Sequence, residues 1–316
     1  IGQGFVGNAI YQKLNKYYKV FTYDLMARLS NSTFKETIER CKIVFVCLPT
    51  PMNQNGSCNL DIIDGVLSKI NEYTDTERIV VIKSTIIPGS TDEFNKKYKN
   101  IDIVFNPEFL TEANAVDDFE NQSRLLLGGS LKSTTKIKQI FSAVFRKTPR
   151  IIKTDAKSAE LVKYVTNTFL ATKVSFANEI YKLCETLDLD YDKIIEMATL
   201  DPRLGDSHWG VPGPDGDFGY GGHCFPKDLA AIIQMSKEKG SLNHVLKATQ
   251  TTNDTVRKTS EKKLGYPEES SYIHGIIINK NNKGYVKFKH TIRFISWSSF
   301  NNGARARNCY LDWKTS

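Results

Sequence analysis

The chain has 316 residues, of which 40% are hydrophobic and 25% charged, and its formal net charge is +8. This length has room for two domains, and the composition is that of a globular protein, which excludes a disordered or fibrous chain. No apolar run approaches the about 20 residues of a membrane-spanning helix, and no signal peptide is visible, so the sequence predicts no contact with a membrane.

The positive charge is concentrated towards the C-terminal end. Residues 261–316 hold ten lysines and arginines against four acidic residues. The rest of the chain therefore has no marked excess of positive charge. This distribution argues against nucleic acid as a partner of the main body of the protein.

The six cysteines are scattered along the chain. They form no CxxC pair and no spacing typical of zinc, so we expect neither a disulfide framework nor a metal site. Such usage is typical of a reducing compartment, and the sequence predicts a cytoplasmic protein. The cysteines are Cys41, Cys47, Cys58, Cys184, Cys224 and Cys309.

The chain opens on a dinucleotide-binding fingerprint, Gly2-Gln3-Gly4-Phe5-Val6-Gly7. A helical apolar pattern follows it, and residues 18–24 then resemble a short strand that ends in Asp24. Glycines in this pattern permit a tight turn and a close approach of the backbone to a pyrophosphate at a helix N-terminus. Asp24 is placed to bind the ribose hydroxyls of adenosine, which favours NAD over NADP. Because no strand precedes Gly2, we expect a fragment that lacks the first strand of the fold.

Apolar runs over 43–48, 79–82 and 101–105 alternate with helical patterns. Such strands predict a parallel sheet covered on both faces, and ligands bind beyond the carboxyl ends of parallel strands. Polar residues at these ends also serve as turn formers, so each alone supports a site no better than a turn. The polar residues at these ends are Thr50, Lys83, Ser84, Thr85, Asn106 and Glu108.

A long helix without proline or glycine is predicted over 158–187. Glu160, Lys163 and Asn167 are spaced by three or four residues and therefore share one face. A solvent-exposed face is the usual setting for such residues, but their neighbours form no wide polar stripe, which favours a buried polar pair. Further helices are predicted over 192–200, 228–239 and 242–258.

The most informative stretch follows a loop rich in glycine, proline and aspartate, and reads Gly221-Gly222-His223-Cys224-Phe225-Pro226-Lys227-Asp228. It presents one thiol on a flexible Gly-Gly approach, with a lysine and an aspartate within one turn. This setting suits a covalent nucleophile better than a packed core cysteine. A buried inert thiol is the alternative interpretation.

The sequence thus predicts an α/β fold. Residues 1–150 are expected to form a Rossmann-type parallel sheet that binds NAD, and residues 151–262 a mainly helical central domain that carries Cys224. Residues 263–316 are expected to form a short, divergent, β-rich tail of unknown role. The aromatic and basic residues of this tail would allow weak nucleic-acid contact, but an ordinary basic hairpin, with strands over 272–278 and 285–295, is the simpler interpretation.

Six segments match one enzyme family in order and in residue type: 2–7, 83–85, 106–112, 163–167, 201–205 and 221–228. The Asn-Pro-Glu-Phe-Leu run from Asn106 and the Gly-Gly-x-Cys-Phe-Pro-Lys-Asp run are the most specific. Over residues 1 to about 260 the chain resembles the UDP-glucose 6-dehydrogenase family of nucleotide-sugar 6-dehydrogenases. The third domain of that family, which binds the uridine end of the substrate, has no recognisable counterpart in the remaining residues.

The resemblance implies NAD as cofactor, a nucleotide sugar as substrate, and a homodimer built around the helix over 158–187. UDP-glucose is the expected substrate, with GDP-mannose and UDP-N-acetylmannosamine as alternatives. Phe225-Pro226-Lys227 favours UDP-glucose, whereas His223 is less typical of that branch. A truncated, inactive NAD-binding remnant is the alternative from a different functional class.

In the implied reaction, the C6 alcohol of the sugar becomes a carboxylate in two hydride transfers, through a thiohemiacetal and a thioester on Cys224. Glu108 would be the general base of thioester hydrolysis. Lys163 and Asn167 would stabilise the oxyanion, and Asp228 would position the water or pair with Lys163.

The resemblance also implies that Thr85 and Glu112 face the nicotinamide and that Arg203 contacts the sugar nucleotide across a dimer interface. The implied catalytic residues are Cys224, Lys163, Asn167, Asp228, Glu108 and Thr85. The implied cofactor-binding residues are Gly2, Gln3, Gly4, Phe5, Val6, Gly7, Asp24, Thr50, Lys83, Ser84, Thr85 and Glu112. The implied substrate-binding residues are Glu108, Phe109, Leu110, Thr111, Glu112, Lys163, Asn167, Arg203, Tyr220 and Gly221.

Overall fold

The computed structural model divides the chain into two units, Ile1–Lys263 and Leu264–Ser316, which are described separately. The residues that the structure describes are 1–74, 77–111, 114–145 and 147–263, together with the strand residues 277–278, 283–288 and 291–296.

The first unit contains a five-stranded sheet with the strand order β1-β2-β3-β4-β5. β1, β2 and β3 are parallel to one another, as are β4 and β5, whereas β3 and β4 meet antiparallel at the single pair Phe105–Gly128. The predicted parallel sheet is therefore confirmed except at this junction. After β3 the chain remains at the carboxyl edge of the sheet, and β4 starts from that edge and runs in the opposite direction to β3. The strands are β1 (Ile43–Val46), β2 (Arg78–Ile82), β3 (Ile101–Phe105), β4 (Arg124–Gly128) and β5 (Arg150–Thr154).

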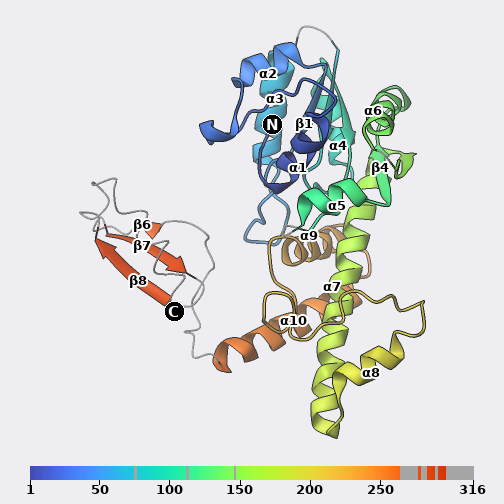
Figure 1. The fold of residues 1–316 in the computed structure, drawn as a ribbon, viewed down its shortest axis with the longest axis vertical. Helices are drawn as coiled ribbons and strands as arrows, with labels where there is room; N and C mark the ends of the chain where they lie inside the picture. Colours follow the sequence, from blue (N-terminus) through green and yellow to red (C-terminus); the bar gives the residue numbers. More distant parts are fainter. Residues whose placement is uncertain are drawn as a thin grey trace. The chain divides into compact units, whose positions relative to one another are not determined.

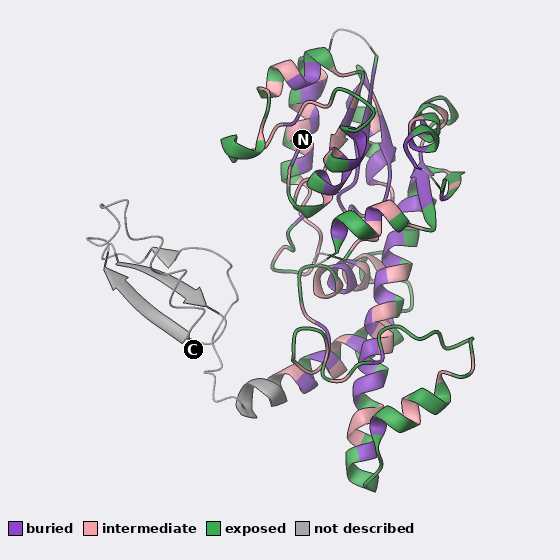
Figure 2. Ribbon diagram, viewed as in Figure 1, coloured by how far each residue is buried: buried purple, intermediate pink, exposed green. Residues whose placement is uncertain are grey.

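Helices cover both faces of this sheet, which explains why its central strand is apolar throughout. All five residues of β2 are buried. Val80 and Ile82 belong to one hydrophobic cluster, while Ile79 and Val81 belong to the other, since successive side chains point to opposite faces. Figure 2 shows the buried residues gathered along the strands and along the long helix of the unit. The covering helices are α1 (Phe5–Leu14), α2 (Phe34–Arg40), α3 (Asp61–Glu72), α4 (Ser90–Lys97), α5 (Ala115–Asn121) and α6 (Leu131–Val144).

The strand predicted over 18–24 is not a strand among the described residues. The backbone N–H of Gly2 donates to the carbonyl of Tyr23 at 2.9 Å. On the other side, the amino group of Ile1 donates to the Phe45 carbonyl, and the Ile1 carbonyl accepts the N–H of Cys47, at the end of β1. Ile1 and Gly2 thus lie between this segment and β1. The bond from Gly2 to Tyr23 is the one backbone hydrogen bond between residues 18–24 and the start of the chain, whereas a β-ladder needs several. Residues 18–24 therefore do not form a strand.

The long helix α7 (Ala156–Leu187) contacts both the sheet and the remaining helices (Figure 1). It begins where the Asp155 side chain accepts a hydrogen bond from the N–H of Ser158 at 2.8 Å, and ends at Asp188 in the left-handed conformation. These signals confirm the helix predicted over 158–187. The remaining helices of this unit are α8 (Tyr191–Ala198), α9 (Phe225–Glu238) and α10 (His244–Lys263).

Helix α9 begins three residues earlier than predicted. Pro226 lies in its first turn, where a missing N–H costs no hydrogen bond, so Phe225 and Pro226 belong to the helix. Cys224 is consequently the N-cap residue, and its carbonyl accepts the N–H of Asp228 at 3.0 Å. This shift places the thiol at the positive end of a helix dipole.

The second unit contains a three-stranded antiparallel sheet formed by β6 (Ile277–Ile278), β7 (Lys283–Phe288) and β8 (Thr291–Ser296). These strands lie within the segment predicted to be β-rich, but the expected single strand over 285–295 is part of two strands. They pair with each other from Phe288–Thr291 to Lys283–Ser296. Of the strand expected over 272–278, residues 272–276 lie outside the described residues. Across the described residues of both units, no helix is long and apolar enough to cross a membrane.

Candidate functional site

The fingerprint turn forms a cradle at the start of α1. Gly2 has a φ of +82°, and a Cβ there would lie 2.3 Å from the carbonyl oxygen of Cys47. A Cβ on Gly7 would lie 1.9 Å from the carbonyl oxygen of Gly2. A Cβ on Gly4, by contrast, would meet nothing within 4 Å, because this glycine borders open space. Gly2 and Gly7 therefore permit the tight turn, while Gly4 keeps a side chain out of the cavity beside the helix N-terminus, where a pyrophosphate would bind.

This cavity has a volume of about 580 Å³ and is lined by the fingerprint and by the segment after Asp24. The Asp24 carboxylate accepts hydrogen bonds from the N–H groups of Gln3, at 2.7 Å, and Met26, at 2.8 Å, and so fixes both walls. Arg28 and Tyr11 also line the cavity and escaped the sequence prediction, although an arginine four residues after the strand-end acid was a usable signal. The volume of the cavity and the N–H groups at the start of α1 fit a bound dinucleotide.

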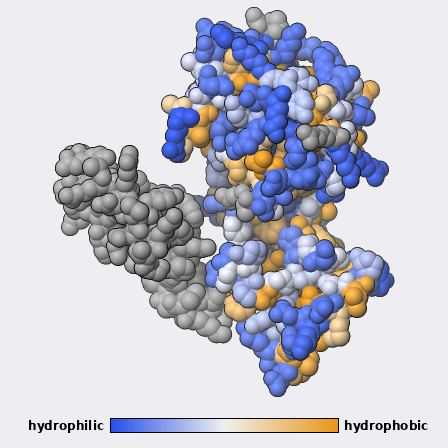
Figure 3. Space-filling view, in the orientation of Figure 1, coloured by the Kyte–Doolittle hydropathy of each residue, from blue (hydrophilic) through white to orange (hydrophobic). Residues whose placement is uncertain are grey.

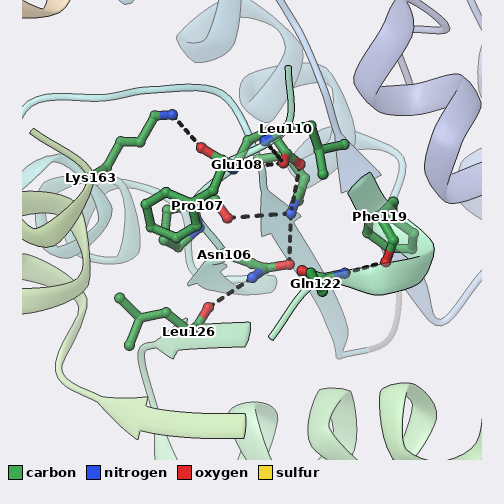
Figure 4. Close-up of polar contacts among 10 residues, drawn as sticks. Asn106, Pro107, Glu108, Leu110, Phe119, Gln122, Leu126 and Lys163 are labelled. Carbon is green, nitrogen blue, oxygen red and sulfur yellow. Dashed lines mark hydrogen bonds and ion pairs between the residues drawn. The ribbon is translucent and has the colours of Figure 1, made fainter. Parts of the chain in front are cut away.

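Lys83, Asn106 and Glu108 meet at the carboxyl ends of β2 and β3. The Lys83 ammonium lies 3.0 Å from the Asn106 side-chain oxygen and 3.2 Å from Glu108 Oε2. Glu108 Oε1 accepts the N–H groups of Phe109 and Leu110 at 2.6 and 2.7 Å. Figure 4 shows Glu108 between Leu110 and Lys163, and Asn106 directed to Leu126.

Lys163 and Asn167 extend from α7 towards the same edge of the sheet. Lys163 is buried, and its ammonium donates to the main-chain carbonyl of Glu108. Asn167 donates to Asp228 Oδ2 at 2.6 Å, a contact between α7 and α9. Burial lowers the pKa of Lys163, while the charges of Asp228, Cys224 and Glu108 oppose this shift, in that order. The cluster thus joins three segments far apart in sequence.

Cys224 is exposed at the start of α9, four residues before the buried Asp228 of this cluster. It is one of the charges that raise the pKa of Lys163, so thiol and ammonium are electrostatic neighbours. Asp228, one turn into α9, is almost fully buried and lies 2.5 Å from the Lys227 ammonium. An exposed thiol next to buried charges, at a helix N-terminus, is the environment expected of a nucleophilic cysteine.

The residues predicted to face the cofactor beyond the fingerprint lie at the same strand ends. Ser84 accepts the N–H of Leu48 through its hydroxyl at 2.8 Å, and Thr50 is buried. The Thr85 carbonyl faces Cys58 Sγ at 3.7 Å. Ser84 and Thr85 therefore fix the loop after β1 against the loop after β2. Glu112 lies outside the described residues.

Two buried side-chain atoms of the described residues have no hydrogen-bond partner, Glu108 Oε2 and Tyr164 Oη. The first has only the ion pair with Lys83, and the second adjoins Lys163 in sequence. Leaving a buried polar group unsatisfied costs about 1–3 kcal/mol. The unsatisfied Glu108 Oε2, at the strand ends, indicates a site arranged for a ligand or water rather than for stability alone.

A pair of buried asparagines, missed in the sequence, holds the loop before Cys224. The N–H of Gly219 donates to Asn178 Oδ1 at 3.0 Å, and the N–H of Tyr220 donates to Asn253 Oδ1 at 2.6 Å. Arg257 adds bonds to the Phe218 carbonyl and to Asp215. No sequence spacing signals contacts that span 33 to 42 residues. These hydrogen bonds fix the loop that leads to Gly221 and Cys224.

Several predicted substrate-binding residues have other surroundings. The Tyr220 ring is buried in a cluster with Ala171, Val174 and Leu229, so only its backbone faces the loop. Arg203 is exposed, and its guanidinium binds Asp201 two residues away.

Phe109, Leu110 and Thr111 continue the strand end that carries Glu108. Phe109 lies beside two cations, with its ring 5.3 Å from the Lys163 ammonium and 4.8 Å from the Arg124 guanidinium. The N–H and hydroxyl of Thr111 donate to Asp118. Within the described residues, no group of acidic, histidine and cysteine side chains could hold a metal ion.

Comparison with known proteins identifies this arrangement. Residues 1–148 match the NAD binding domain of the UDP-glucose/GDP-mannose dehydrogenase family, and residues 157–255 match its central domain. The chain belongs to this family. Its cofactor is NAD, as the fingerprint and Asp24 predict.

Among its relatives, the putative UDP-glucose 6-dehydrogenase YtcA of Bacillus subtilis is 34% identical over 253 residues, which are 76% of this chain and 57% of that protein. The UDP-glucose dehydrogenase of Pyrobaculum islandicum superposes with a TM-score of 0.68 at 26% identity, covering 82% of this chain and 64% of that one. The UDP-D-ManNAc dehydrogenase of Pyrococcus horikoshii, with a TM-score of 0.69 and 20% identity, shares the fold over 84% of this chain and 71% of its own. The chain spans about half the length of the curated relatives that it matches.

Proposed function

We propose that this protein is an NAD-dependent dehydrogenase that oxidises UDP-glucose to UDP-glucuronate. The observation that carries the proposal is the convergence of Lys163, Asn167, Asp228 and Glu108 on one buried cluster beside the exposed Cys224. A cluster of this kind serves acyl transfer through a covalent thioester. NAD bound at the fingerprint turn would accept the hydrides, one NAD molecule for each of the two transfers.

The chemistry follows from the positions of the groups. After the C6 alcohol has been oxidised to the aldehyde, Cys224 Sγ bonds to C6 and forms a thiohemiacetal. The second oxidation turns this adduct into a thioester. The oxygen at C6 is negative in the addition and hydrolysis steps, and the Lys163 ammonium and the Asn167 amide are the donors that would stabilise it. Asp228, bonded to Asn167, fixes the direction of that amide.

Glu108 completes the cycle as general base. Its Oε1 is already occupied by two backbone N–H groups, so Oε2 is the atom that would take a proton from water. Thr85 and the residues after β1 would border the nicotinamide, and Gly221 with the backbone of Tyr220 would border the sugar. Arg203, which is exposed and binds Asp201 in this chain, would contact the substrate held by another subunit.

UDP-glucose is favoured over other nucleotide sugars because the relatives described above at more than 25% identity are UDP-glucose dehydrogenases by name. GDP-mannose and UDP-N-acetylmannosamine remain the alternatives within the family. A protein that binds NAD without turnover is the alternative of a different class, because residues after 255 lie outside the matched family domains. We assign residues 1–150 to NAD binding and 151–262 to the central domain.

An apolar stripe on α7 supports a homodimer. The stripe includes Val165, Phe169, Phe176 and Leu183, which are 51–67% exposed and repeat at helical spacing. Figure 3 shows further apolar residues at the surface of the lower half of the molecule, over α7 and α8. Exposed rows of large apolar side chains mark protein interfaces. We infer that two copies of the chain pack through this stripe.

We also assign the enzyme to the cytoplasm, because the cysteines that the structure describes form no disulfide.

The test is to incubate the protein with NAD and UDP-glucose and to follow NADH by its absorbance. Two NADH per sugar are expected, and Cys224→Ser should abolish the formation of glucuronate. GDP-mannose and UDP-N-acetylmannosamine tested in parallel decide among substrates. Binding of NAD without turnover on any of the three would refute the proposed activity.

A further inference from the structure

We propose that Lys83 is the positioning residue of Glu108, rather than a ligand of the cofactor. It would hold Glu108 Oε2 in place towards the hydrolytic water through their ion pair of 3.2 Å. This inference rests on the proposed function, because it assumes that Glu108 is the base of thioester hydrolysis.

The contacts of Lys83 leave little capacity for a cofactor. Its side chain is 1% exposed, and its ammonium faces Asn106 Oδ1 at 3.0 Å, Glu108 Oε2 at 3.2 Å and the Pro107 carbonyl at 3.5 Å. An ammonium has three donors, and three acceptors surround it here. All three belong to consecutive residues of the segment after β3, so Lys83 fixes this segment to the end of β2.

Asn106 makes the arrangement rigid. Its amide nitrogen donates to the Leu126 carbonyl at 2.7 Å, which orients its oxygen towards Lys83. The ammonium is therefore held from β2, β3 and β4 together. A lysine fixed in this way acts as a point charge of constant position beside Glu108.

The two oxygens of Glu108 differ as a result. Oε1 accepts two backbone N–H groups, whereas Oε2 has no hydrogen bond and only the ion pair with Lys83. Lys163 is a second cation near Glu108, but it bonds to the main-chain carbonyl of Glu108 and interacts electrostatically with Cys224. The two lysines thus have separate tasks, with Lys83 serving the base and Lys163 the oxyanion.

In the step that Lys83 would serve, the water oxygen bonds to the C6 carbonyl carbon and one water proton passes to Glu108 Oε2. The bond between C6 and Cys224 Sγ then breaks, and the sulfur leaves as a thiolate. The second water proton is lost from the product acid. No further oxidant is consumed, since both hydride transfers precede this step.

Lys83→Met tests the inference. After the variant is mixed with NAD and UDP-glucose, the burst of NADH that precedes thioester hydrolysis is expected to have the same amplitude as in the wild type. The rate constant of thioester hydrolysis should then fall at least tenfold, and intact-protein mass spectrometry should reveal an adduct that maps to Cys224. The dissociation constant of NAD should stay within twofold of that of the wild type.

Lys13→Met is the matched control. Lys13 is also buried, 4% exposed, and forms an ion pair of 2.5 Å with Glu120 away from the site. This control loses a comparable ion pair from the same unit, and no adduct should accumulate in it.

The double variant Lys83→Met with Glu108→Gln removes both charges and serves if the single variant does not fold. Its hydrolysis rate should equal that of Glu108→Gln alone, because Lys83 acts through Glu108. A further fall in the double variant, wild-type decay of the adduct in Lys83→Met, or a tenfold loss of NAD affinity would each overturn the inference. A wild-type protein without turnover would instead refute the proposed function, and the inference with it.

Discussion

Replacing Glu160 by glutamine tests how the catalytic helix is joined to the sheet. The Glu160 side chain is fully buried in α7 and accepts hydrogen bonds from the N–H groups of Gly89 and Thr91 and from the Thr91 hydroxyl. It therefore caps α4 from another part of the chain. Glutamine has nearly the same size, and its one oxygen can serve Thr91, but its NH2 group then faces the Gly89 N–H.

One buried donor thus loses its acceptor in Glu160→Gln, which should lower the free energy of unfolding by about 1–3 kcal/mol. Because Lys163 lies one turn further along α7, kcat should fall as well, with NAD affinity unchanged.

Urea denaturation of both proteins measures the difference, and the midpoint should fall at a constant slope. Glu36→Gln is the control, since the half-exposed Glu36 carboxylate, which accepts the N–H of Thr33, the N-cap residue of α2, should matter far less. A Glu160→Gln protein within about 0.5 kcal/mol of the wild type would show that the buried cap does not hold α7, contrary to this reasoning.

Four further changes test other parts of the site. Gly4→Ala should leave the melting temperature unchanged but weaken NAD binding at least tenfold, since its methyl group would enter the open cavity; equal affinity would contradict the cradle. Asp228 raises the pKa of Lys163 against burial, so Asp228→Asn should lower that pKa further below 10.5 and shift the alkaline limb of residual activity to lower pH. Asn253→Leu should raise the KM for the sugar nucleotide, whereas Asn253→Asp keeps the accepting oxygen and should restore it; equal effects of both would indicate a general packing defect. Phe169→Glu should convert a dimer to a monomer in light scattering, and an unaltered mass would exclude the α7 stripe as the interface.

Motifs with short spacing were readable from sequence. The glycine spacing at 2, 4 and 7 predicts the turn, in which a Cβ would clash at Gly2 and Gly7. Lys163 and Asn167 share a helix face by periodicity. The start of α9 was misjudged because the expected helix began after Pro226 rather than around it. The strand expected over 18–24 failed because a strand depends on its neighbours, not on its own composition.

Contacts between distant residues were not readable. Asn167 and Asp228 are separated by 61 residues, and Lys83 and Asn106 by 23. Lys83 in particular resembled a cofactor ligand, since a polar residue at the end of a parallel strand usually faces one. Only the packed structure reveals that its charge is directed into the protein. Sequence therefore predicts which residues gather at an edge, but not which of them bind one another.

The exposure of Cys224 allows its thiol to be counted by alkylation. Among the five cysteines that the structure describes, Cys224 alone is exposed, and Cys184 is buried. Burial raises the pKa of the Cys41 and Cys58 thiols and raises that of Cys47 to about 11, so these remain protonated at neutral pH. Under excess iodoacetamide, Cys224 should thus be alkylated first among these five. The amplitude of this first phase would report the fraction of molecules with an accessible Cys224 thiol, before any substrate is known.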